Sequence, residues 1–393
     1  MRSNNGLFNC EGLATLSRRS FLKASAILSF AALPELAFAK TPTDTRLLTI
    51  LLRGGMDGMY ALPPVGDSGL PAMRKNINPD NVLKLDGYFA MHPAFSTVHG
   101  MYDKGEALLV HATSIPYTGR SHFEGQNVME SGVMTPYASE SGWMGRGLDL
   151  LGYNSIAMSL PVPLILRGKA QRDNYYPSWM KPVPPDIYNE VLPLWADDLS
   201  LASFSQQVSA ELMAGKQPGP LNSPGGTNSL DGLARVAGQR FNKPDGPRMA
   251  VLDHVGFDTH SNENSQNSNR FREVDQAIAA FRREIHDDVW KNTLVVTVTE
   301  FGRTAAENGS EGTDHGYGTA IFVMGGKLKK SGIVADWPGL KKKNLFEERD
   351  LMATIDAREL YGSLLSTVLE LDPERIRKDV LEYQPKGRFD AYL

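Results

Sequence analysis

The chain has 393 residues, of which 41% are hydrophobic and 22% are charged, values that are ordinary for a globular protein. Its formal net charge of −4, with no long basic run, excludes a strongly basic nucleic-acid-binding protein. The length is sufficient for one large α/β domain or for two smaller domains.

The N-terminus has the pattern of an export signal. Paired arginines in "SRRSFLK" (17–23) precede an apolar segment too short to span a bilayer, which ends in Ala37-Phe38-Ala39. The paired arginines followed by Phe-Leu-Lys match a twin-arginine signal. We therefore expect residues 1–39 to be a signal peptide read by the twin-arginine export machinery. The product is then periplasmic or secreted, with no stable membrane span. Cleavage would remove Cys10, the only cysteine, so the rest of the chain has no disulfide.

After the signal, short apolar runs that end in glycine or polar residues alternate with helical patterns. Such runs are typical of buried strands that lead into ligand-facing loops. The helical pattern of residues 269–290 has apolar residues at three- and four-residue spacing. We predict an α/β fold, a mostly parallel central sheet with helices on both faces. The predicted strands are 45–55, 107–114, 249–257, 293–302 and 319–326.

The middle of the chain is rich in proline, serine and asparagine. Residues from about 172 to 247 contain two short helical patterns, "PPDIYNEVLPLW" and "LASFSQQVSAELM", and residues 216–228 have the composition of an exposed linker. We expect an irregular insertion in one α/β domain that comprises residues 40–393.

Polar residues follow the first two predicted strands, where ligands bind in parallel sheets. Asp57 in "RGGMDG" is either a functional carboxylate or a turn aspartate that caps local amides. Ser121 begins a predicted helix, and with Glu124 it matches a capping box. Helix N-termini also attract anions, so Ser121 is a candidate nucleophile or anion contact, with Arg120 and His122 beside it.

The later strands are followed by possible metal ligands. Asp253, His254, Asp258 and His260 follow one strand, and an aspartate and a histidine two residues apart can reach one divalent ion. Glu300 ends another strand, where a carboxylate is costly unless it binds a cation or pairs with a group such as Arg303.

Asp314 and His315 in "GTDHGYG" precede the last predicted strand, so they too can face the ligand edge. The remaining histidines have no comparable neighbours, and we expect them to be structural or on the surface: His92, His99, His111 and His286.

The order of these motifs resembles the exported domain-of-unknown-function family 1501. The resemblance rests on the paired arginines, "RGGMDG", "SHFEGQ", "GFDTH", "TEFGRTAAENGSEGTDHG" and "DWPGL", and extends along nearly the whole chain after the signal. That family is grouped with the alkaline-phosphatase-like superfamily of phosphatases and sulfatases. The resemblance implies an alkaline-phosphatase-like fold, two metal sites and a Ser, Thr or modified Cys nucleophile.

The superfamily pattern also implies roles for single residues. Asp57 resembles the first metal aspartate, and Ser121 resembles the nucleophile, with Arg120 as a contact for the substrate anion. Asp258 and His260 resemble the next metal pair, with Asp253 as an alternative for the aspartate.

The chain departs from the superfamily pattern at the second metal site. Glu300 stands where an aspartate is expected, and Phe301 stands where the superfamily has a ligand histidine. His315 resembles the last ligand histidine and would join Asp258 and His260, with Asp314 binding the metal or orienting His315.

Two functions follow from these expectations. The first is an exported metal-dependent hydrolase acting on phosphate or sulfate esters, with Ser121 attacking and Arg120 or Arg303 binding the anion. Zinc, manganese or calcium would each suit the carboxylate and imidazole ligands. The second is a non-catalytic exported binding protein that keeps the fold and one metal ion.

Overall fold

The computed structural model describes residues 44–170, 172–177, 190, 192–193, 209 and 228–393. The predicted signal peptide, the two short helical patterns of the insertion and the predicted linker 216–228 lie almost entirely outside these residues. Pro42–Leu393 is one compact unit by its contacts. Within the described part, no helix is both long and apolar enough to cross a membrane.

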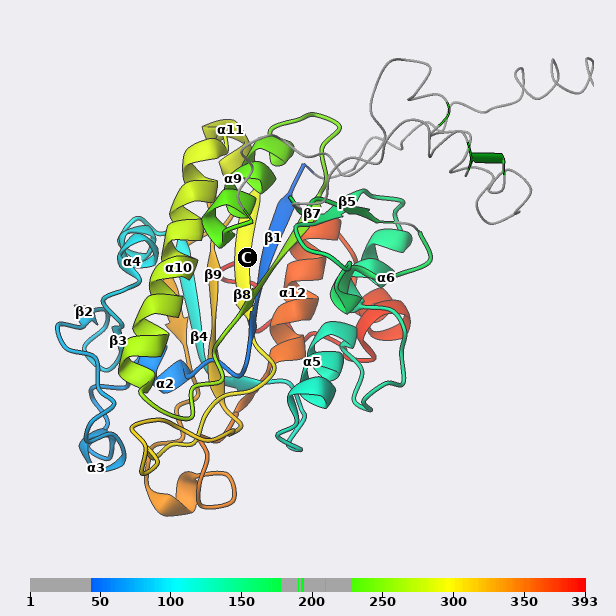
Figure 1. The fold of residues 1–393 in the computed structure, drawn as a ribbon. Helices are drawn as coiled ribbons and strands as arrows, with labels where there is room; N and C mark the ends of the chain where they lie inside the picture. Colours follow the sequence, from blue (N-terminus) through cyan, green and yellow to red (C-terminus); the bar gives the residue numbers. More distant parts are fainter. Residues whose placement is uncertain (1–43, 171, 178–189, 191, 194–208, 210–227) are drawn as a thin grey trace, which may run out of the picture. The chain divides into compact units, whose positions relative to one another are not determined.

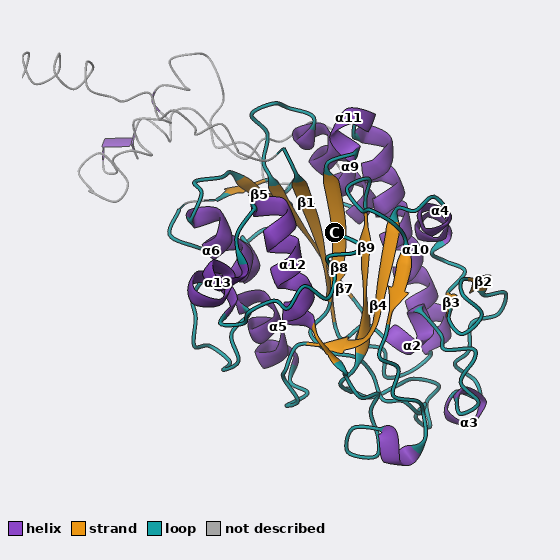
Figure 2. Ribbon diagram, turned by 180° about the vertical axis from the view of Figure 1, so that it is seen from behind, coloured by secondary structure: helices purple, strands orange, loops and turns teal. Residues whose placement is uncertain are grey.

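The described elements are a central sheet, helices on its two faces and a separate β-hairpin (Figures 1 and 2). The strands are β1 (Arg46–Arg53), β2 (Leu83–Lys84), β3 (Ala90–Met91), β4 (Ala107–Ser114), β5 (Ser155–Ala157), β6 (Asp173–Asn174), β7 (Met249–Val255), β8 (Thr293–Val298), β9 (Thr319–Met324), β10 (Gly332–Val334) and β11 (Ile355–Asp356).

Most helices are short, and α10 and α12 are the longest described ones. The helices are α2 (Gly58–Ala61), α3 (Leu70–Met73), α4 (Ser96–Asp103), α5 (His122–Ser131), α6 (Trp143–Asp149), α9 (Leu230–Phe241), α10 (Glu263–Glu284), α11 (Asp287–Trp290), α12 (Ala357–Leu369) and α13 (Pro373–Ile376). Two 3-10 turns, η1 (Leu164–Leu166) and η2 (Lys342–Asn344), and one π-helical turn, η3 (Arg377–Leu381), complete the described elements.

The sheet confirms the predicted α/β class. Its order is β10-β4-β9-β8-β1-β7-β5-β6, with β11 paired to β4. β1 lies at the centre, parallel to both β7 and β8. All five strands predicted from the sequence are present, and β4 has the predicted bounds.

One strand reverses the parallel pattern. β9 is antiparallel to both β4 and β8. The segment 299–318 therefore leaves β8 and enters β9 at the same edge of the sheet, which is also where β1, β4 and β7 end. This reversal brings the residues of the predicted ligand loops to one edge.

Alternating side chains of β1 divide the core between the two faces. Leu47 and Leu51 pack with α5, α6 and α12, whereas Leu48, Ile50 and Leu52 pack with α4, α9 and α10. Both faces of β1 are fully buried, as expected for a central strand covered by helices. The helices cover the two faces of the sheet and not the ends of its strands, so polar residues can lie at the strand ends.

The long helix begins earlier and ends earlier than its periodicity predicts. α10 spans 263–284, and the chain turns to an extended conformation at Ile285 before α11. Ile285 is buried, so the apolar spacing continues across the break and hides it in the sequence. The early start places Glu263, three residues after His260, in the buried first turn of the helix.

Candidate metal centre

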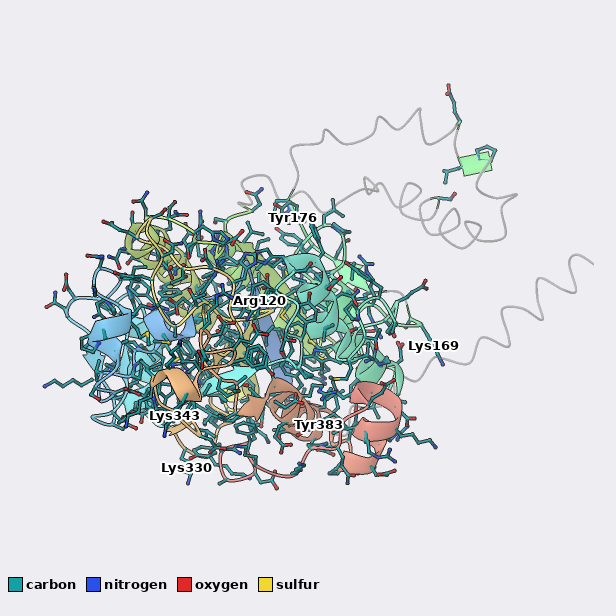
Figure 3. The ribbon with its side chains drawn as sticks, turned by 90° about the horizontal axis from the view of Figure 1, so that it is seen from below. Arg120, Lys169, Tyr176, Lys330, Lys343 and Tyr383 are labelled. Atoms are coloured by element: carbon teal, nitrogen blue, oxygen red, sulfur yellow. The ribbon has the colours of Figure 1, made fainter. Side chains whose placement is uncertain are left out.

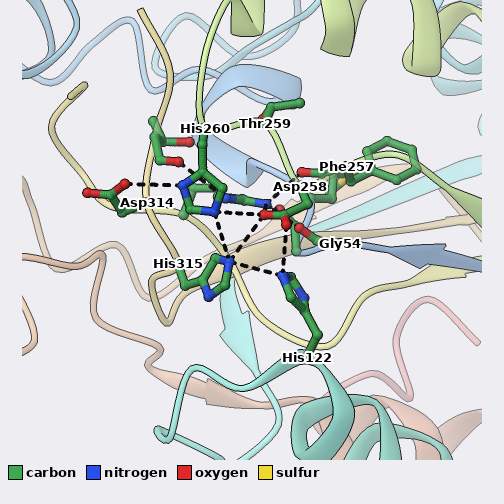
Figure 4. Close-up of polar contacts among 12 residues, drawn as sticks. Gly54, His122, Phe257, Asp258, Thr259, His260, Asp314 and His315 are labelled. Atoms are coloured by element: carbon green, nitrogen blue, oxygen red, sulfur yellow. Dashed lines mark hydrogen bonds and ion pairs between the residues drawn. The ribbon is translucent and has the colours of Figure 1, made fainter. Parts of the chain in front are cut away.

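Three histidines and one aspartate meet at the edge where β4, β7 and β8 end (Figure 4). Ligand atoms of His122, Asp258 and His315 all lie within 4.8 Å of one another. The Nε2 atom of His260 lies 3.1 Å from Nε2 of His315 and 3.0 Å from Oδ1 of Asp258. The Nε2 atoms of His122 and His315 are 2.9 Å apart. These four side chains form what we call the metal-ligand cluster.

Each histidine in the cluster has its other ring nitrogen bound to an oxygen. Nδ1 of His122 donates to the Glu300 carboxylate at 2.8 Å, and Nδ1 of His315 donates to the Arg120 carbonyl at 2.9 Å. Nδ1 of His260 donates to Asp314 at 3.2 Å. A proton on Nδ1 leaves a lone pair on Nε2 in the neutral ring, so three lone pairs converge. This is the usual arrangement around a bound metal ion.

Asp258 is held ionised beside the histidines. Burial alone would raise its pKa, but the hydrogen bond from Arg303 and the charge of Arg303 lower the pKa of Asp258 to about 2. The Arg303 donor lies 2.7 Å from Oδ1 of Asp258. An ionised carboxylate and neutral imidazoles are the protonation states that a metal ion requires.

Glu300 lies behind the cluster instead of in it. Its carboxylate is fully buried and accepts hydrogen bonds from His122, from the Gly54 amide at 2.8 Å and from Gln126 at 3.0 Å. Burial raises the pKa of Glu300, but these bonds outweigh burial and hold that pKa below its ordinary value. In turn, the hydrogen bond to Glu300 raises the pKa of His122, which makes its ring a stronger ligand base.

The cluster is partly open to solvent. The side chains of Asp258 and His260 are 45% and 47% exposed, while those of His122 and His315 are about a quarter exposed. A catalytic zinc ion must take up water or substrate, and zinc can expand from four to five ligands to do so when solvent reaches the site. The exposure therefore fits a site that a small molecule can reach.

The glycines of "GTDHGYG" allow its backbone to pass close to two other segments. A Cβ atom on Gly312 would lie 2.2 Å from a backbone atom of His260, and one on Gly316 would lie 2.3 Å from Arg303. The amide of Gly316 donates to the Gly302 carbonyl at 2.9 Å. This close pairing after β8 sets the position of His315.

Phe301 occupies the place where the superfamily pattern expects a ligand histidine. It is buried, and its ring centroid lies 4.9 Å from that of His122 and 5.2 Å from that of His315. Phe301 thus supports two rings of the cluster. A phenyl ring has no lone pair to donate to a metal ion, so Phe301 itself is not a ligand.

Asp57 does not join the cluster. It caps α2 by accepting from the amides of Met59 and Tyr60, and it forms a buried ion pair with Arg74 at 2.5 Å. These contacts are those of a turn aspartate that caps local amides, the second of the two alternatives expected from the sequence. Asp253 also lies apart from the cluster, since its carboxylate is paired with Arg53 at 2.7 Å.

The two arginines expected to bind an anion are occupied by protein oxygens. Arg303 is buried and donates to Asp258 and to carbonyls of Gly54, Gly55, Phe257 and Thr313. Arg120, labelled near the middle of the folded part in Figure 3, pairs with Glu347 and Asp350. Arg349, which was not predicted from the sequence, is 39% exposed, pairs with Asp350 at 3.4 Å and donates to the His315 carbonyl at 3.0 Å.

Ser121 takes the predicted position but not the predicted cap. It is the N-cap residue of α5, yet its hydroxyl makes no capping bond, and Glu124 accepts instead from Tyr117 at 2.6 Å. The Ser121 amide donates to the Tyr117 hydroxyl at 3.1 Å. The capping-box interpretation is therefore wrong, and the hydroxyl is not used by the helix end.

His122 was not among the metal ligands predicted from the sequence. Its position beside Ser121 suggested anion binding, and Glu300 and Asp314 were the predicted ligands instead. The signal was present, because His122 follows β4 at the same edge as the other ligands. The antiparallel direction of β9, which joins these ends, was not visible in the sequence.

The Glu300 contact leads to a test of the cluster. Glu300→Gln keeps the shape of the side chain but removes its charge, so we expect the affinity for zinc to fall by about 10- to 100-fold. Competition with a chromophoric chelator would measure this affinity. Glu124→Gln, a matched change on α5 at a residue bonded to Tyr117, should leave the affinity within about twofold. Equal affinity of Glu300→Gln and wild type would contradict the role of Glu300.

Comparison with known proteins gives one family match. The model of the family described as "Protein of unknown function (DUF1501)" matches residues 202–378. This range includes Asp258, His260, Glu300, Asp314 and His315, whereas the "RGGMDG" and "SHFEGQ" motifs lie before it. No curated protein sequence matches the chain significantly.

Solved structures show distant likenesses in fold. The lipoteichoic acid synthase LtaP from Listeria monocytogenes has 11% identity and a TM-score of 0.37, over 76% of this chain and 70% of that one. A protein in the alkaline phosphatase superfamily from Vibrio parahaemolyticus has 11% identity and a TM-score of 0.41, over 84% and 67%. Alkaline phosphatase from the Antarctic bacterium TAB5 has 12% identity and a TM-score of 0.34, over 74% and 94%. At these scores the likenesses assign no activity to this chain.

Proposed function

We propose that the protein is an exported hydrolase that binds one divalent transition-metal ion and cleaves a phosphate or sulfate ester. The observation that supports this most is the convergence of three imidazole Nε2 atoms and one carboxylate, with every Nδ1 already bound to an oxygen. His122, Asp258, His260 and His315 would hold the ion. The paired arginines of "SRRSFLK" support export by the twin-arginine machinery.

The ligand set narrows the choice of metal. Three imidazoles with one carboxylate suit zinc, and manganese is the alternative. Calcium, which fitted the sequence expectation, prefers six to eight oxygen ligands and does not suit this set. We therefore name zinc as the metal to test first.

A bound divalent ion supplies Lewis-acid stabilisation of the negative charge that develops on the ester oxygens. In the reaction, the bond between the ester oxygen and phosphorus or sulfur breaks. Water is added overall, so that the products are an alcohol and inorganic phosphate or sulfate. Ser121 remains the candidate nucleophile, because its hydroxyl is free of a capping bond beside His122. Arg349, which is 39% exposed and pairs with Asp350, lies next to His315 and is the candidate contact for the anion.

Metal content and turnover, measured on the same sample, test this proposal. We expect one zinc per chain in protein purified after export, and hydrolysis of 4-nitrophenyl phosphate or 4-nitrophenyl sulfate that a chelator abolishes and zinc restores. Ser121→Ala should keep the metal and lose the turnover, because it removes the nucleophile and no ligand. Metal-free protein that zinc does not bind would refute the metal proposal.

A non-catalytic binding protein is the second candidate. Phe301 fills the place of a second-site ligand, and Arg120 and Arg303 are engaged by protein oxygens, which removes features that two-metal hydrolysis uses. A stoichiometric zinc ion with no turnover of either ester would favour this candidate.

A further inference from the structure

A cavity lies beside the metal-ligand cluster. Its volume is about 410 Å³, and its lining includes Arg53 at the end of β1, Asp253 in β7 and several residues of α5. Gln126 connects it to the cluster, since its amide donates to Glu300 at 3.0 Å and its carbonyl accepts from Arg53 at 2.9 Å. Glu300 in turn binds His122. One glutamine and one glutamate thus separate the cavity from a ligand of the cluster.

The polar lining of this cavity carries no net charge. It contains two arginines, Arg53 and Arg167, and two acidic residues, Glu130 and Asp253. Arg53 binds both acids, at 2.8 Å to Glu130 and 2.7 Å to Asp253. Such a lining gives no net attraction to an anion. It does offer several fixed donors and acceptors, because Gln126 and Asn127 add two amides.

The cavity also has an apolar part that is open to solvent. Phe123 is 80% exposed, and Tyr137 and Leu160 are each 63% exposed. These are three of the seven large apolar side chains that are exposed in the described residues, and all three line this cavity. Exposed apolar side chains gathered at one place, next to polar groups, are typical of a binding site.

We propose that this cavity binds an uncharged sugar ring, the alcohol part of an ester whose anionic group lies at the metal-ligand cluster. A sugar presents hydroxyls, which the amides and charged pairs can bind, and a C–H face, which can lie on the exposed rings. Because the cavity lining carries no net charge, we expect the anionic group of the substrate to bind at the metal-ligand cluster and not in the cavity. Gln126 of the cavity lining binds Glu300, and Glu300 binds His122, so the two sites are close enough for one substrate to contact both. This inference names a substrate class for the proposed hydrolase and rests on that proposal.

Binding of neutral glucans to the full-length, zinc-loaded protein tests the cavity without any ester chemistry. We expect at least one of maltohexaose, cellohexaose and laminarihexaose to bind with a dissociation constant of about 10 mM or tighter in calorimetry. Phe123→Ala should weaken this binding by up to about tenfold, the range of a lost aromatic contact, whereas Phe123→Trp should keep it. Val65→Ala, which removes an exposed apolar side chain outside the cavity, should bind like wild type.

Measurements of turnover distinguish the proposed sugar site from the proposed hydrolase activity. With glucose 6-phosphate and glucose 6-sulfate, Phe123→Ala should lower kcat/KM more than it does with the 4-nitrophenyl esters. Glucan binding that depends on Phe123, in a protein that hydrolyses no ester, would support the sugar site and refute the hydrolase. Ester hydrolysis by a protein that binds none of the glucans would overturn the sugar site and leave the hydrolase standing. Equal binding by Phe123→Ala and wild type would also overturn it.

Discussion

His315→Ala is expected to lose the bound metal and all metal-dependent turnover. Nε2 of His315 lies within 3.1 Å of ligand atoms of His122, His260 and Asp258, so it contacts all three other members of the cluster. Four-ligand zinc sites contribute about 10–16 kcal/mol, so one ligand is worth about 3 kcal/mol and its loss should weaken zinc binding by about 100-fold or more.

The measurement is zinc content after dialysis against a buffered free zinc concentration, followed by thermal unfolding with and without zinc. His286→Ala is the control, because His286 is an exposed histidine at the start of α11. We expect zinc to raise the unfolding temperature of wild type and His286→Ala but not of His315→Ala. Full zinc occupancy in His315→Ala would show that the ion, if present, lies elsewhere.

Arg303→Met is expected to cost about 3–5 kcal/mol of folding free energy, because it leaves several buried carbonyl oxygens without a donor, at about 1–3 kcal/mol each. Arg303 is 1% exposed and joins three segments that each follow or precede a strand at the ligand edge. Methionine would leave these carbonyl oxygens without a donor and Asp258 without its counter-charge. Equilibrium denaturation by guanidinium chloride would measure the loss.

Two further variants separate the structural role of Arg303 from the anion-binding role expected from the sequence. Arg282→Met removes a partly exposed arginine that is paired with Asp287 and lies over the Trp290 ring, and its cost should stay at or below about 1 kcal/mol. Arg303→Lys keeps the charge but loses the fork of donors, so we expect an intermediate stability. A raised KM for an ester, with unchanged stability in Arg303→Met, would instead favour a direct contact with substrate.

The fold followed from local patterns because buried parallel strands have a strong sequence signature. β4, for example, is apolar along its length and ends in polar residues, so its bounds could be predicted. The direction of β9 could not be predicted, since antiparallel and parallel buried strands have the same composition. The break at Ile285 was also hidden, because the apolar spacing continues through it.

The candidate site could be predicted in part. Asp258, His260 and His315 were expected together, and the structure places them together. The roles of Glu300 and Asp314 could not be separated from those of ligands, because a carboxylate that orients a histidine and one that binds a metal have the same residue type and the same position after a strand. Only the distances show that both carboxylates contact Nδ1 of a histidine.

The four members of the metal-ligand cluster come from three parts of the chain, around residues 122, 258–260 and 315. Nearly two hundred residues separate the first from the last. Few of these side chains can be close together before the sheet has assembled, so an ion that binds all four selects the finished protein over partly folded forms. By mass action, such an ion at a hundred times its dissociation constant would add about 2.7 kcal/mol against unfolding. A bound ion would then stabilise the whole folded sheet against unfolding. Because proteases cleave unfolded chains, a lower zinc concentration would make the protein more susceptible to proteolysis.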